Sequence, residues 1–433
     1  MIEMSREYKK QRKVGFKRGI LLIILIVLIA AVGAVLYLRP KTEPEEEAKP
    51  RLEAPKIASS VTVGSTGDIL IHSPIYDAAY VGDGKYDFSR DFALVAPYYA
   101  EPDLMVANLE VTCGGADVGY SSYPIFNCPD NIVKTLADAG VDICLTANNH
   151  SNDSGKNGIL RTLDVIEKNE MDHLGTRQTD EEHYIYTKLI NGIKLGMACY
   201  TYDTREITDG RKSLNGLPLY DGAEDLVNSF CYSDLDELYD SVKSDLDQMK
   251  MLGVEANIFY IHWGNEYWDD PSEEQQEIAQ KLCDLGVDVI VGGHPHVIEA
   301  YETLKGKNGH ETLCLYSMGN QLSNQRRVYM DEDGHRGYTE DGMIFSVTFS
   351  KFNNGKVKIT GLDILPTWVD LTDDGQGTVY SIVALDNEKK PADWGASSKN
   401  EAIASYNRTM GRIGSDYNRF RESIRLEPDP ERF

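Results

Sequence analysis

The alternation of strand-like and helix-like stretches after residue 60 restricts the fold of this 433-residue chain more than any other feature of its sequence. Short apolar stretches rich in β-branched residues predict strands at 61–71, 103–110, 141–147, 194–200, 255–264, 287–293, 312–320, 342–350 and 356–366. Amphipathic stretches predict helices at 129–140, 158–169, 233–253 and 271–286. Strands separated by helices of this length indicate an α/β fold.

Residues 19–38 form an uncharged apolar run near the N-terminus. At about 1.5 Å per residue, a helix over this run is roughly 30 Å long, which matches the hydrocarbon core of a bilayer. Seven Lys or Arg residues precede the run within residues 1–18, and few follow it closely. The positive-inside rule therefore predicts a single-pass anchor in the cell membrane, with a cytoplasmic basic segment at 1–18 and an extracellular C-terminal domain. A cleaved signal peptide is the alternative, although the run is longer than a usual signal core.

Residues 39–59 are rich in Pro and Glu, which predicts a solvated linker. Residues 371–433 are assigned to a C-terminal extension, in which 400–424 has a helical pattern without a functional interpretation. The formal charge of −25 argues against nucleic acid as a partner, because non-specific binding depends on Lys and Arg. It also disfavours long-range attraction of an acidic polymer, unless a bound cation or a local basic groove reverses the field.

Seven cysteines lie beyond the apolar run, which is too few for a disulfide scaffold. Cys113 and Cys128 flank a polar, Gly-rich segment and could pair in an oxidising exterior. No Cys-x-x-Cys pair occurs, so a zinc site made of thiolates is not expected.

Polar side chains gather where five of the predicted strands end. In chain order these ends are Gly67-Asp68, Asn108-Leu109-Glu110, Asn148-Asn149-His150, His262 to Glu266, and Gly292-Gly293-His294-Pro295-His296. In a parallel α/β sheet, functional groups collect at the carboxyl ends of strands. A hydrophobic core gives no reason for such a pattern, so it predicts one shared site.

Each of these residues alone has a simpler structural interpretation. Asp68 is typical of a helix N-cap or turn, Asn149 of a left-handed turn, and His262 of a buried core histidine. His294 and His296 are more specific, because a turn constrained by Gly and Pro can direct two imidazoles at neighbouring points. Imidazole, carboxylate and amide oxygen together suit Zn²⁺, Mn²⁺ or Fe²⁺. The set therefore predicts a site for a divalent metal ion.

From about residue 60 to 370 the chain resembles the CapA/PgsA family of bacterial capsule proteins, which is associated with poly-γ-glutamate synthesis and export. This family is similar to the calcineurin-like metallophosphoesterases. The matching stretches are GDILI, ANLE, LTANNHSNDSG, IHWGNEY, GGHPHV and YSMGNQ. The resemblance implies a metallophosphoesterase-like layered α/β/β/α sandwich over 60–370, held at the membrane. It also implies two kinds of partner, namely an anionic capsule polymer and membrane synthase or exporter subunits.

The resemblance further implies that six residues bind one or two metal ions. The first ion would be bound by Asp68 and His296, the second by Asn149, His262 and His294, and Glu110 would stand where phosphoesterases have a bridging aspartate. His150 would face the substrate as an acid or anion stabiliser. Asp153 is a candidate carboxylate partner for His150, and a turn role is an equal alternative.

The chain departs from the phosphoesterase pattern at two positions. Phosphoesterases usually have Asp-x-His, but Leu70 stands two residues after Asp68. His72 would lie on the same side of a continuing strand and is a candidate substitute. Glu110 also lengthens the bridging carboxylate. Both departures weigh against a tight two-metal centre and leave a single ion as the alternative.

Three functions are compatible with these observations. The first is a membrane-anchored capsule protein whose metal site binds or processes the γ-linked glutamate chain outside the cell. The second is a free-standing extracellular hydrolase of phosphoesters or γ-glutamyl amides without a capsule role. The third is a structural relic in which an ion only holds loops. A bound cation would explain how so acidic a protein meets an acidic polymer.

Overall fold

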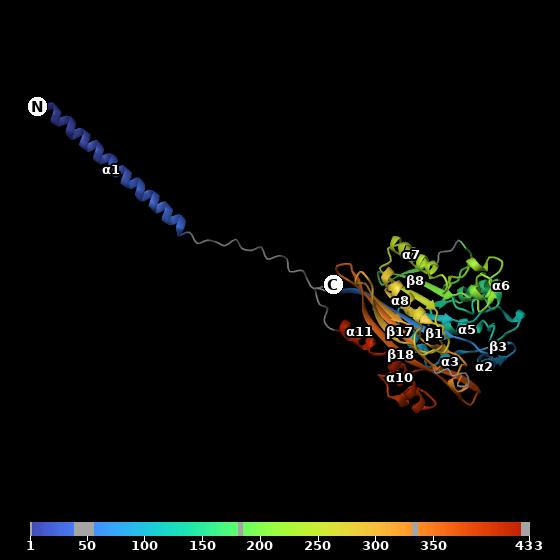
Figure 1. Ribbon diagram of the computed structural model, residues 1–433. Coiled ribbons are helices and arrows are strands. Elements are labelled where there is room, and N and C mark those ends of the chain that lie inside the picture. Colours follow the sequence, from blue (N-terminus) through green and yellow to red (C-terminus); the bar gives the residue numbers. More distant parts are fainter. Residues whose placement is uncertain (1, 39–55, 181–184, 331–336, 426–433) are drawn as a thin grey trace. The chain divides into compact units, whose positions relative to one another are not determined.

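The computed structural model describes residues 2–38, 56–180, 185–330 and 337–425, which belong to two units (Figure 1). The N-terminal unit, residues 1–54, contains helix α1 (Ile2–Tyr37). Within α1, Phe16–Tyr37 is long and apolar enough to cross a membrane, which supports the predicted anchor. The predicted linker, 39–59, lies outside the described residues over 39–55, and its last three residues are not linker because strand β1 (Ile57–Ile69) already begins at Ile57.

The C-terminal unit, residues 55–433, contains two large β-sheets. In spatial order, the first consists of β19 (Thr378–Ala384), β18 (Val357–Asp373), β17 (Asp341–Phe352), β1 (Ile57–Ile69), β4 (Leu104–Leu109), β5 (Ile143–Leu145) and β6 (Asp172–Leu174), with β16 (Asn320–Leu322) beside β1. Strands β1, β4, β5 and β6 are parallel, whereas β17, β18 and β19 continue the sheet in antiparallel pairs. The carboxyl ends of β1, β4 and β5 therefore point to the same end of this sheet.

The second sheet has a parallel centre. Its order is β11 (Ser229–Phe230), β8 (Ile193–Tyr202), β12 (Ala256–His262), β13 (Val289–Gly293), β15 (Glu311–Leu315) and β14 (Tyr301–Lys305), with β7 (Tyr186–Ile190) beside β8. Strands β8, β12, β13 and β15 are parallel. The last residues of β12 and β13, His262 and Gly293, are register partners.

The two sheets pack face to face through apolar side chains. Along β12, Ala256, Ile258 and Tyr260 join a buried cluster with side chains of β1, β4, β8, β13 and β15. Phe259 and Ile261, which alternate with them, join a separate cluster on the outer face. Side chains of a strand point alternately to its two faces, so a strand covered on both faces is apolar throughout.

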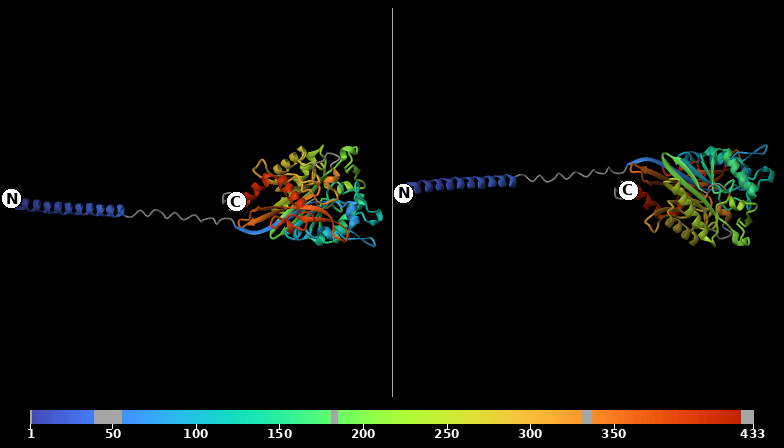
Figure 2. Two further views of the ribbon diagram at one scale, coloured as in Figure 1. Left: turned by 90° about the horizontal axis from the view of Figure 1, so that it is seen from below. Right: turned by 90° about the horizontal axis from the view of Figure 1, so that it is seen from above.

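Helices cover the outer faces of both sheets (Figures 1 and 2). The first sheet is covered by α2 (Ser73–Ala78), α3 (Ser89–Phe92), α4 (Ala96–Tyr99), α5 (Asn131–Ala139) and α6 (Gly155–Lys168). The second is covered by α7 (Leu235–Met251) and α8 (Glu273–Leu285). The order of layers is therefore helix, sheet, sheet, helix, and the predicted layered α/β/β/α sandwich is confirmed.

The segment after residue 370 is built into this sandwich. Residue 370 falls inside β18, and β19 extends the same sheet beyond it. Helices α10 (Lys399–Ile413) and α11 (Ser415–Arg425) pack against β18. Ser405 and Arg408 of α10 donate hydrogen bonds to the buried carboxylate of Asp341. The described part of 371–433 thus belongs to one compact unit with the domain predicted at 60–370.

Cys113 and Cys128 lie side by side in the first outer layer. Both side chains are fully buried, and their sulfur atoms are 3.9 Å apart as free thiols. Burial and the neighbouring Cys113 raise the pKa of Cys128 well above its ordinary value. Their pairing in an oxidising exterior stays a prediction, which thiol mapping of the protein from intact cells would check.

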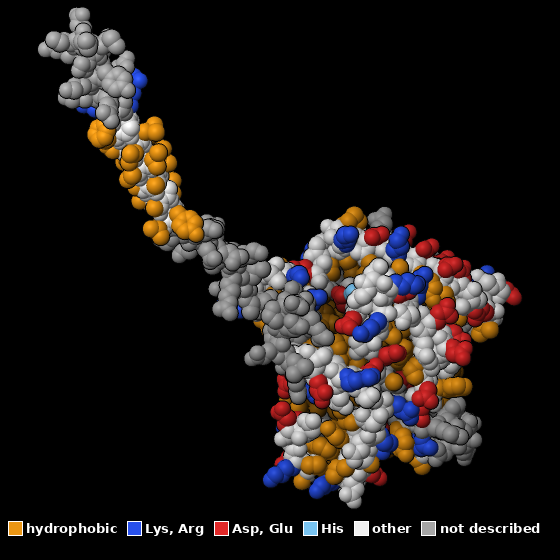
Figure 3. Space-filling view, turned by 60° about the vertical axis from the view of Figure 1, so that its left-hand side comes forward, with side chains coloured by type: hydrophobic (Ala, Val, Ile, Leu, Met, Phe, Trp, Pro, Cys, Tyr) orange, Lys and Arg blue, Asp and Glu red, His pale blue; other side chains and the backbone are white. Residues whose placement is uncertain are grey.

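The surface of the C-terminal unit carries both signs of charge. On the face shown in Figure 3, Lys and Arg side chains lie among the Asp and Glu side chains. Although the net charge of the chain is −25, the acidic side chains on this face do not form one continuous surface, because basic side chains lie between them.

Candidate metal centre

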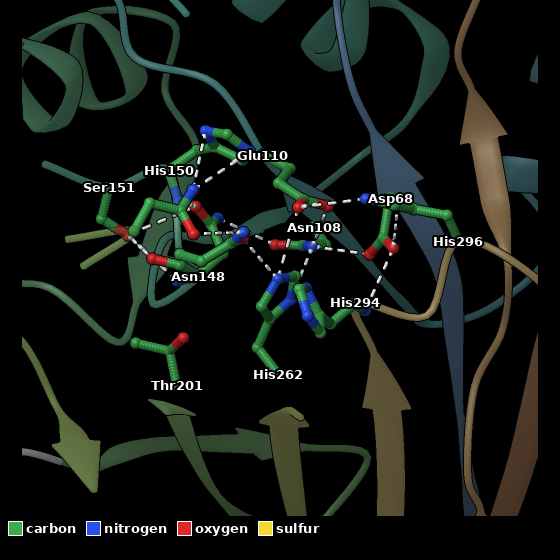
Figure 4. A network of polar contacts seen from close by, with 12 residues as sticks. Asp68, Asn108, Glu110, Asn148, His150, Ser151, Thr201, His262, His294 and His296 are labelled. Atoms are coloured by element: carbon green, nitrogen blue, oxygen red, sulfur yellow. Dashed lines mark hydrogen bonds and ion pairs between the residues drawn. The ribbon is translucent and has the colours of Figure 1, made fainter. Parts of the chain in front are cut away.

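The five predicted strand ends meet in one buried cluster (Figure 4). The side chains come from β1 (Asp68), the residue after β4 (Glu110), the turn after β5 (Asn149 and His150), the end of β12 (His262) and the turn after β13 (His294 and His296). None of them is more than 4% exposed. Strands β1, β4 and β5 belong to the first sheet and β12 and β13 to the second, so the cluster lies where the two sheets meet.

Amide groups hold the two carboxylates of the cluster together. Asn108 Nδ2 donates a hydrogen bond of 2.7 Å to Asp68 Oδ1 and a longer one of 3.5 Å to Glu110 Oε2. Asn148 Nδ2 donates to Asn108 Oδ1 at 3.1 Å, which fixes the direction of the Asn108 amide. Two buried carboxylates repel each other, and a shared donor offsets part of that repulsion.

His296 is paired with the acidic side of the cluster. Its Nδ1 lies 3.2 Å from Asp68 Oδ2 and 3.1 Å from Asn320 Oδ1. Burial by itself lowers the pKa of His296, but the charges of Glu110 and Asp68 and the Asp68 hydrogen bond outweigh it and raise the pKa to about 9. Burial by itself raises the pKa of Asp68, and the contacts with His296 more than offset it, so that the pKa is lowered.

Two atoms of the cluster have no hydrogen-bond partner among the described residues, Glu110 Oε1 and His294 Nδ1. Glu110 Oε1 lies 3.3 Å from His262 Nε2 and 3.9 Å from His296 Nε2. Burial, followed by the charge of His262, lowers the pKa of His294 well below its usual range, which keeps the imidazole neutral and its lone pair available. Buried polar atoms are rarely left unpaired, so an unpaired carboxylate oxygen and an imidazole nitrogen fit a divalent cation.

The spacing of the donors offers two overlapping places for an ion. Ligand atoms of Glu110, His294 and His296 lie within 4.8 Å of one another, and so do those of Asp68, Glu110 and His262. The resemblance instead pairs Asp68 with His296 and His262 with His294. In both assignments Glu110 is common to the two ion positions, which agrees with a bridging position for this carboxylate.

The turn that carries the two histidines has an unusual backbone. His294 and His296 have φ angles of 97° and 60°, in the left-handed region that residues other than glycine rarely adopt. Such residues cost about 1–3 kcal/mol each and persist where neighbours hold them in place. Here His294 N donates to Asp68 Oδ2 at 3.1 Å, and Tyr267 N donates to the Pro295 carbonyl oxygen at 2.8 Å.

The predicted acid and its carboxylate are in contact. His150 Nδ1 lies 2.8 Å from Asp153 Oδ2, and the Asp153 side chain is fully buried. Phe126 N donates to the same oxygen at 2.6 Å, and the Phe126 ring meets the His150 ring edge-on with centroids 4.7 Å apart. Asp153 N also donates to the His150 carbonyl oxygen at 3.2 Å, so the turn role and the partner role of Asp153 coexist.

His72 lies outside both ligand groups. The expectation that it shares a side with Asp68 requires β1 to continue, but β1 ends at Ile69 and His72 forms the N-terminal cap of α2. The His72 Nδ1 atom lies 3.2 Å from the Leu70 carbonyl oxygen, and its ring packs against Phe126. His72 was a candidate substitute for the missing histidine on the premise that β1 continues as far as His72. This premise is wrong.

Two further residues of the cluster were not assigned a role from the sequence, Asn108 and Asn320. Asn108 precedes Glu110 by two positions and so lies on the same side of the strand end, which is a signal that strand alternation provides. Asn320 contacts His296 across 24 residues of chain, and no local pattern indicates such a contact.

The fold and the cluster define a layered α/β protein with a buried candidate site for a divalent metal ion. The sequence profile of the bacterial capsule synthesis protein PGA_cap matches residues 62–325, and the chain belongs to this family. The resemblance of the motif stretches to bacterial capsule proteins is thereby confirmed.

Two relatives are similar over large parts of the chain. The capsule biosynthesis protein CapA of Bacillus anthracis is 24% identical over 322 residues, which cover 73% of this chain and 70% of that protein. The PGA biosynthesis protein CapA of Bacillus subtilis strain 168 is 27% identical over 234 residues, which cover 54% of this chain. The match spans 53% of the length of the second relative.

Similarity to solved structures is lower. NAD nucleotidase of Haemophilus influenzae gives a TM-score of 0.41 at 14% identity, covering 84% of this chain and 66% of that one. Purple acid phosphatase PPD1 of yellow lupin gives a TM-score of 0.31 at 12% identity, covering 70% and 53%. The layered fold is established by the sheet order and packing of this chain itself.

Glu299, three residues after His296, predicts a pH dependence of stability. Its side chain is fully buried, Gln275 Nε2 donates to Oε2 at 2.7 Å, and burial, which outweighs that hydrogen bond, raises its pKa to about 8. Between about pH 4.5 and pH 8, the Glu299 carboxyl group therefore keeps its proton in the folded state and loses it in the unfolded state. Stability is therefore lost as the pH rises from about 4.5 to about 8, by at most about 1.4 kcal/mol per pH unit.

We expect the neutral variant Glu299→Gln to remove this loss. Its gain in unfolding free energy over the unmodified protein should be small at pH 4.5, grow towards pH 8 and level off above it. Denaturant unfolding at several pH values measures this difference. A gain that stays constant with pH would contradict the assignment.

Proposed function

We propose that this chain is a membrane-anchored capsule protein that acts outside the cell on an anionic polymer, poly-γ-glutamate. One observation carries the proposal: donor side chains from five strand ends of two sheets form one buried cluster. Within it, a carboxylate oxygen and an imidazole nitrogen have no hydrogen-bond partner in the part of the chain that the structure describes. Membership of the capsule synthesis family supports the capsule role. The name of the Bacillus subtilis relative, a PGA biosynthesis protein, supports the polymer.

The cluster would hold one or two divalent ions, with Zn²⁺, Mn²⁺ and Fe²⁺ suited to its mixture of imidazoles and carboxylates. The proposed ligands are Asp68, Glu110, Asn149, His262, His294 and His296. When bound, such an ion polarises an acyl or phosphoryl oxygen and lowers the pKa of water. Its positive charge would also offset the local carboxylates, so that an acidic polymer can approach.

The residues beside the cluster supply a proton donor. Asp153 accepts the Nδ1 hydrogen of His150 and thereby fixes the orientation of the ring. In the protonated ring, Nε2 then carries the second proton, which is available to a leaving group. The edge-on Phe126 ring restricts the movement of the imidazole. His150 is therefore the proposed general acid, and Asp153 is its positioning residue.

The proposed topology places the basic segment at 1–18 in the cytoplasm and the C-terminal unit outside. The apolar helix Phe16–Tyr37 and the excess of Lys and Arg before it support this orientation. An extracellular site would meet the polymer at the membrane, beside synthase or exporter subunits. Nucleic acid is not a proposed partner, given the net charge of −25.

The alternative is a free-standing extracellular hydrolase of phosphoesters or γ-glutamyl amides. The contact between His150 and Asp153 supports catalysis in this alternative as in the capsule function, because a purely structural ion does not need an oriented proton donor. A relic whose ion only holds loops needs the ligands but not this pair.

His150→Ala separates these functions, because His150 lies beside the proposed ligands without being one of them. We expect full-length His150→Ala protein in detergent to keep its bound metal. Poly-γ-glutamate and phosphodiester turnover should fall by about 10²–10⁴-fold, which is the usual contribution of a general acid. Metal content is measured by elemental analysis and turnover by product release. The control is His173→Ala, in the edge strand β6 and outside the proposed ligand set.

The outcomes are distinct when capsule formation is scored in cells carrying the same variants. Loss of turnover and of capsule supports a polymer-processing capsule protein. Turnover lost with the capsule intact supports the free-standing hydrolase. Bound metal without turnover in the unmodified protein, together with an intact capsule in His150→Ala cells, leaves only the relic. Absence of metal from the unmodified protein overturns the proposed site.

A further inference from the structure

A β-hairpin that no sequence motif indicated lies against the candidate metal centre. It consists of β9 (Ser213–Leu214) and β10 (Leu217–Pro218), joined by the turn Asn215-Gly216. Both turn residues have positive φ angles, 48° and 72°, as a two-residue type I′ turn requires. Asn-Gly is the preferred sequence for this turn, so the backbone alone explains an asparagine at position 215. It does not explain where the Asn215 side chain points.

Hydrogen bonds and a small apolar cluster hold the hairpin in place. Asn152, two residues after His150, donates hydrogen bonds to the carbonyl oxygens of Leu217 and Pro218 at 3.1 and 3.2 Å. Gly216 N donates to Thr204 Oγ1 at 2.8 Å. Beneath it, a small buried apolar cluster is formed by Ile159, Leu214, Leu219, Ala223 and Val227. The tip of the hairpin is therefore held against the turn that carries Asn149 and His150.

The Asn215 side chain meets the proposed ligand Asn149. Asn149 Nδ2 donates to Asn215 Oδ1 at 3.1 Å, while Asn149 Oδ1 lies 2.8 Å from His262 Nε2. The oxygen and nitrogen of an asparagine amide are nearly equal in size, so only their partners decide which of them points into the cluster. Because Asn215 offers an acceptor, the NH₂ group of Asn149 turns outward and its oxygen faces the metal centre.

The same side chain also contacts the proposed acid. Asn215 Nδ2 lies 3.5 Å from both Nδ1 and Nε2 of His150, so the amide rests against the imidazole ring. One residue of the hairpin thus touches both functional residues of the turn after β5. This placement follows from the fixed tip and not from the turn sequence, because another Asn-Gly turn, Asn191-Gly192, has no such contacts.

We propose that Asn215 is a positioning residue that orients the Asn149 amide oxygen towards the divalent ion. This inference rests on the proposed function, because it requires an ion at the cluster. If the Asn149 amide turned over, an NH₂ group would face the ion and could not bind it. Removing the acceptor at position 215 therefore weakens binding of the ion, although Asn215 itself does not bind it.

The test is the affinity of the full-length protein in detergent for Mn²⁺, measured by titration calorimetry. Asn215→Gly removes the side chain without backbone strain, since glycine adopts a φ of 48° freely. Asn191→Gly is the matched control: Asn191 and Gly192 have φ angles of 51° and 79°, and Asn191 donates to Ser60 O and Asp103 Oδ1, which are not proposed ligands. Asn215→Asp keeps an oxygen acceptor for the Asn149 amide.

We expect Asn215→Gly to weaken Mn²⁺ binding by about 10–100-fold, as loss of outer-shell partners usually does. Asn215→Asp should recover most of the affinity, and Asn191→Gly should keep all of it. Unmodified affinity in Asn215→Gly, together with loss in Asn149→Ala, overturns this inference and leaves the proposed function standing. No Mn²⁺ binding by the unmodified protein overturns both.

Discussion

The double variant His294→Ala, His296→Ala is expected to bind no divalent metal ion under conditions in which the unmodified protein is fully loaded. These residues supply two of the three imidazoles in the proposed ligand groups. Loss of a single outer-shell partner already costs about 10–100-fold in affinity, so the loss of two ligands should exceed the range of a titration. Elemental analysis after dialysis measures the bound metal.

Folding of the variant must be separated from its metal binding, because His296 is paired with the buried carboxylate of Asp68. His294→Ala alone serves this purpose, since His294 Nδ1 has no hydrogen-bond partner among the described residues. We expect this single variant to keep the circular dichroism spectrum of the unmodified protein and to bind metal more than about 100-fold more weakly. His173→Ala, in the edge strand β6, is the matched control. Full metal content in the folded double variant would falsify the assigned site.

The second large effect is expected on stability, from Gly292→Ala in β13. A Cβ atom at this position would lie 1.8 Å from the Tyr316 carbonyl oxygen and 2.5 Å from Trp263 Nε1. These two groups are joined by a hydrogen bond of 2.9 Å, so a methyl group would both clash and separate donor from acceptor. We expect the free energy of unfolding to fall by about 3 kcal/mol or more, from overpacking and the broken hydrogen bond together. Denaturant unfolding measures it.

The same substitution at another glycine, Gly411→Ala, is expected to raise the stability of the protein instead of lowering it. A Cβ atom at Gly411 in α10 meets nothing within 4 Å, and its φ lies in the ordinary range. Alanine favours a helix over glycine by about 0.5–1 kcal/mol, so this variant should be more stable than the unmodified protein. Equal stability of both variants would contradict the close packing of β13 against the segment at Tyr316.

The strands and helices that frame the site are largely predictable from local sequence patterns. Strands such as β12 and β13 are apolar throughout because they are covered on both faces, and α8 carries a capping box at Ser272 and a left-handed glycine at its end. The pairing of strands is less accessible. β1 lies between β4 and β17, which follow it by about 40 and 280 residues, and no local pattern encodes such contacts. Local patterns therefore do not show the division into two sheets, which only the family resemblance implied.

The candidate ligands are predictable for the same reason that the strands are, because each follows a strand end. Their supporting contacts are not. Asn320 reaches His296 across 24 residues, and Asn215 reaches Asn149 across 66. His72 shows the limit of extrapolating strand alternation. Strand β1 ends at Ile69, before His72, so the alternation of side chains no longer determines where the His72 side chain lies. Local patterns thus indicate which residues bind and leave open which residues orient them.

The split of the cluster between two sheets has a consequence for the whole domain. The oxygen donors Asp68, Glu110 and Asn149 belong to one half, and all three imidazole donors belong to the other. An ion that binds both kinds of atom would crosslink the halves, so its affinity would add to the cohesion of the sandwich. At a free ion concentration 1,000 times the dissociation constant, this amounts to about 4 kcal/mol. Chelation should then lower the melting temperature of the entire unit.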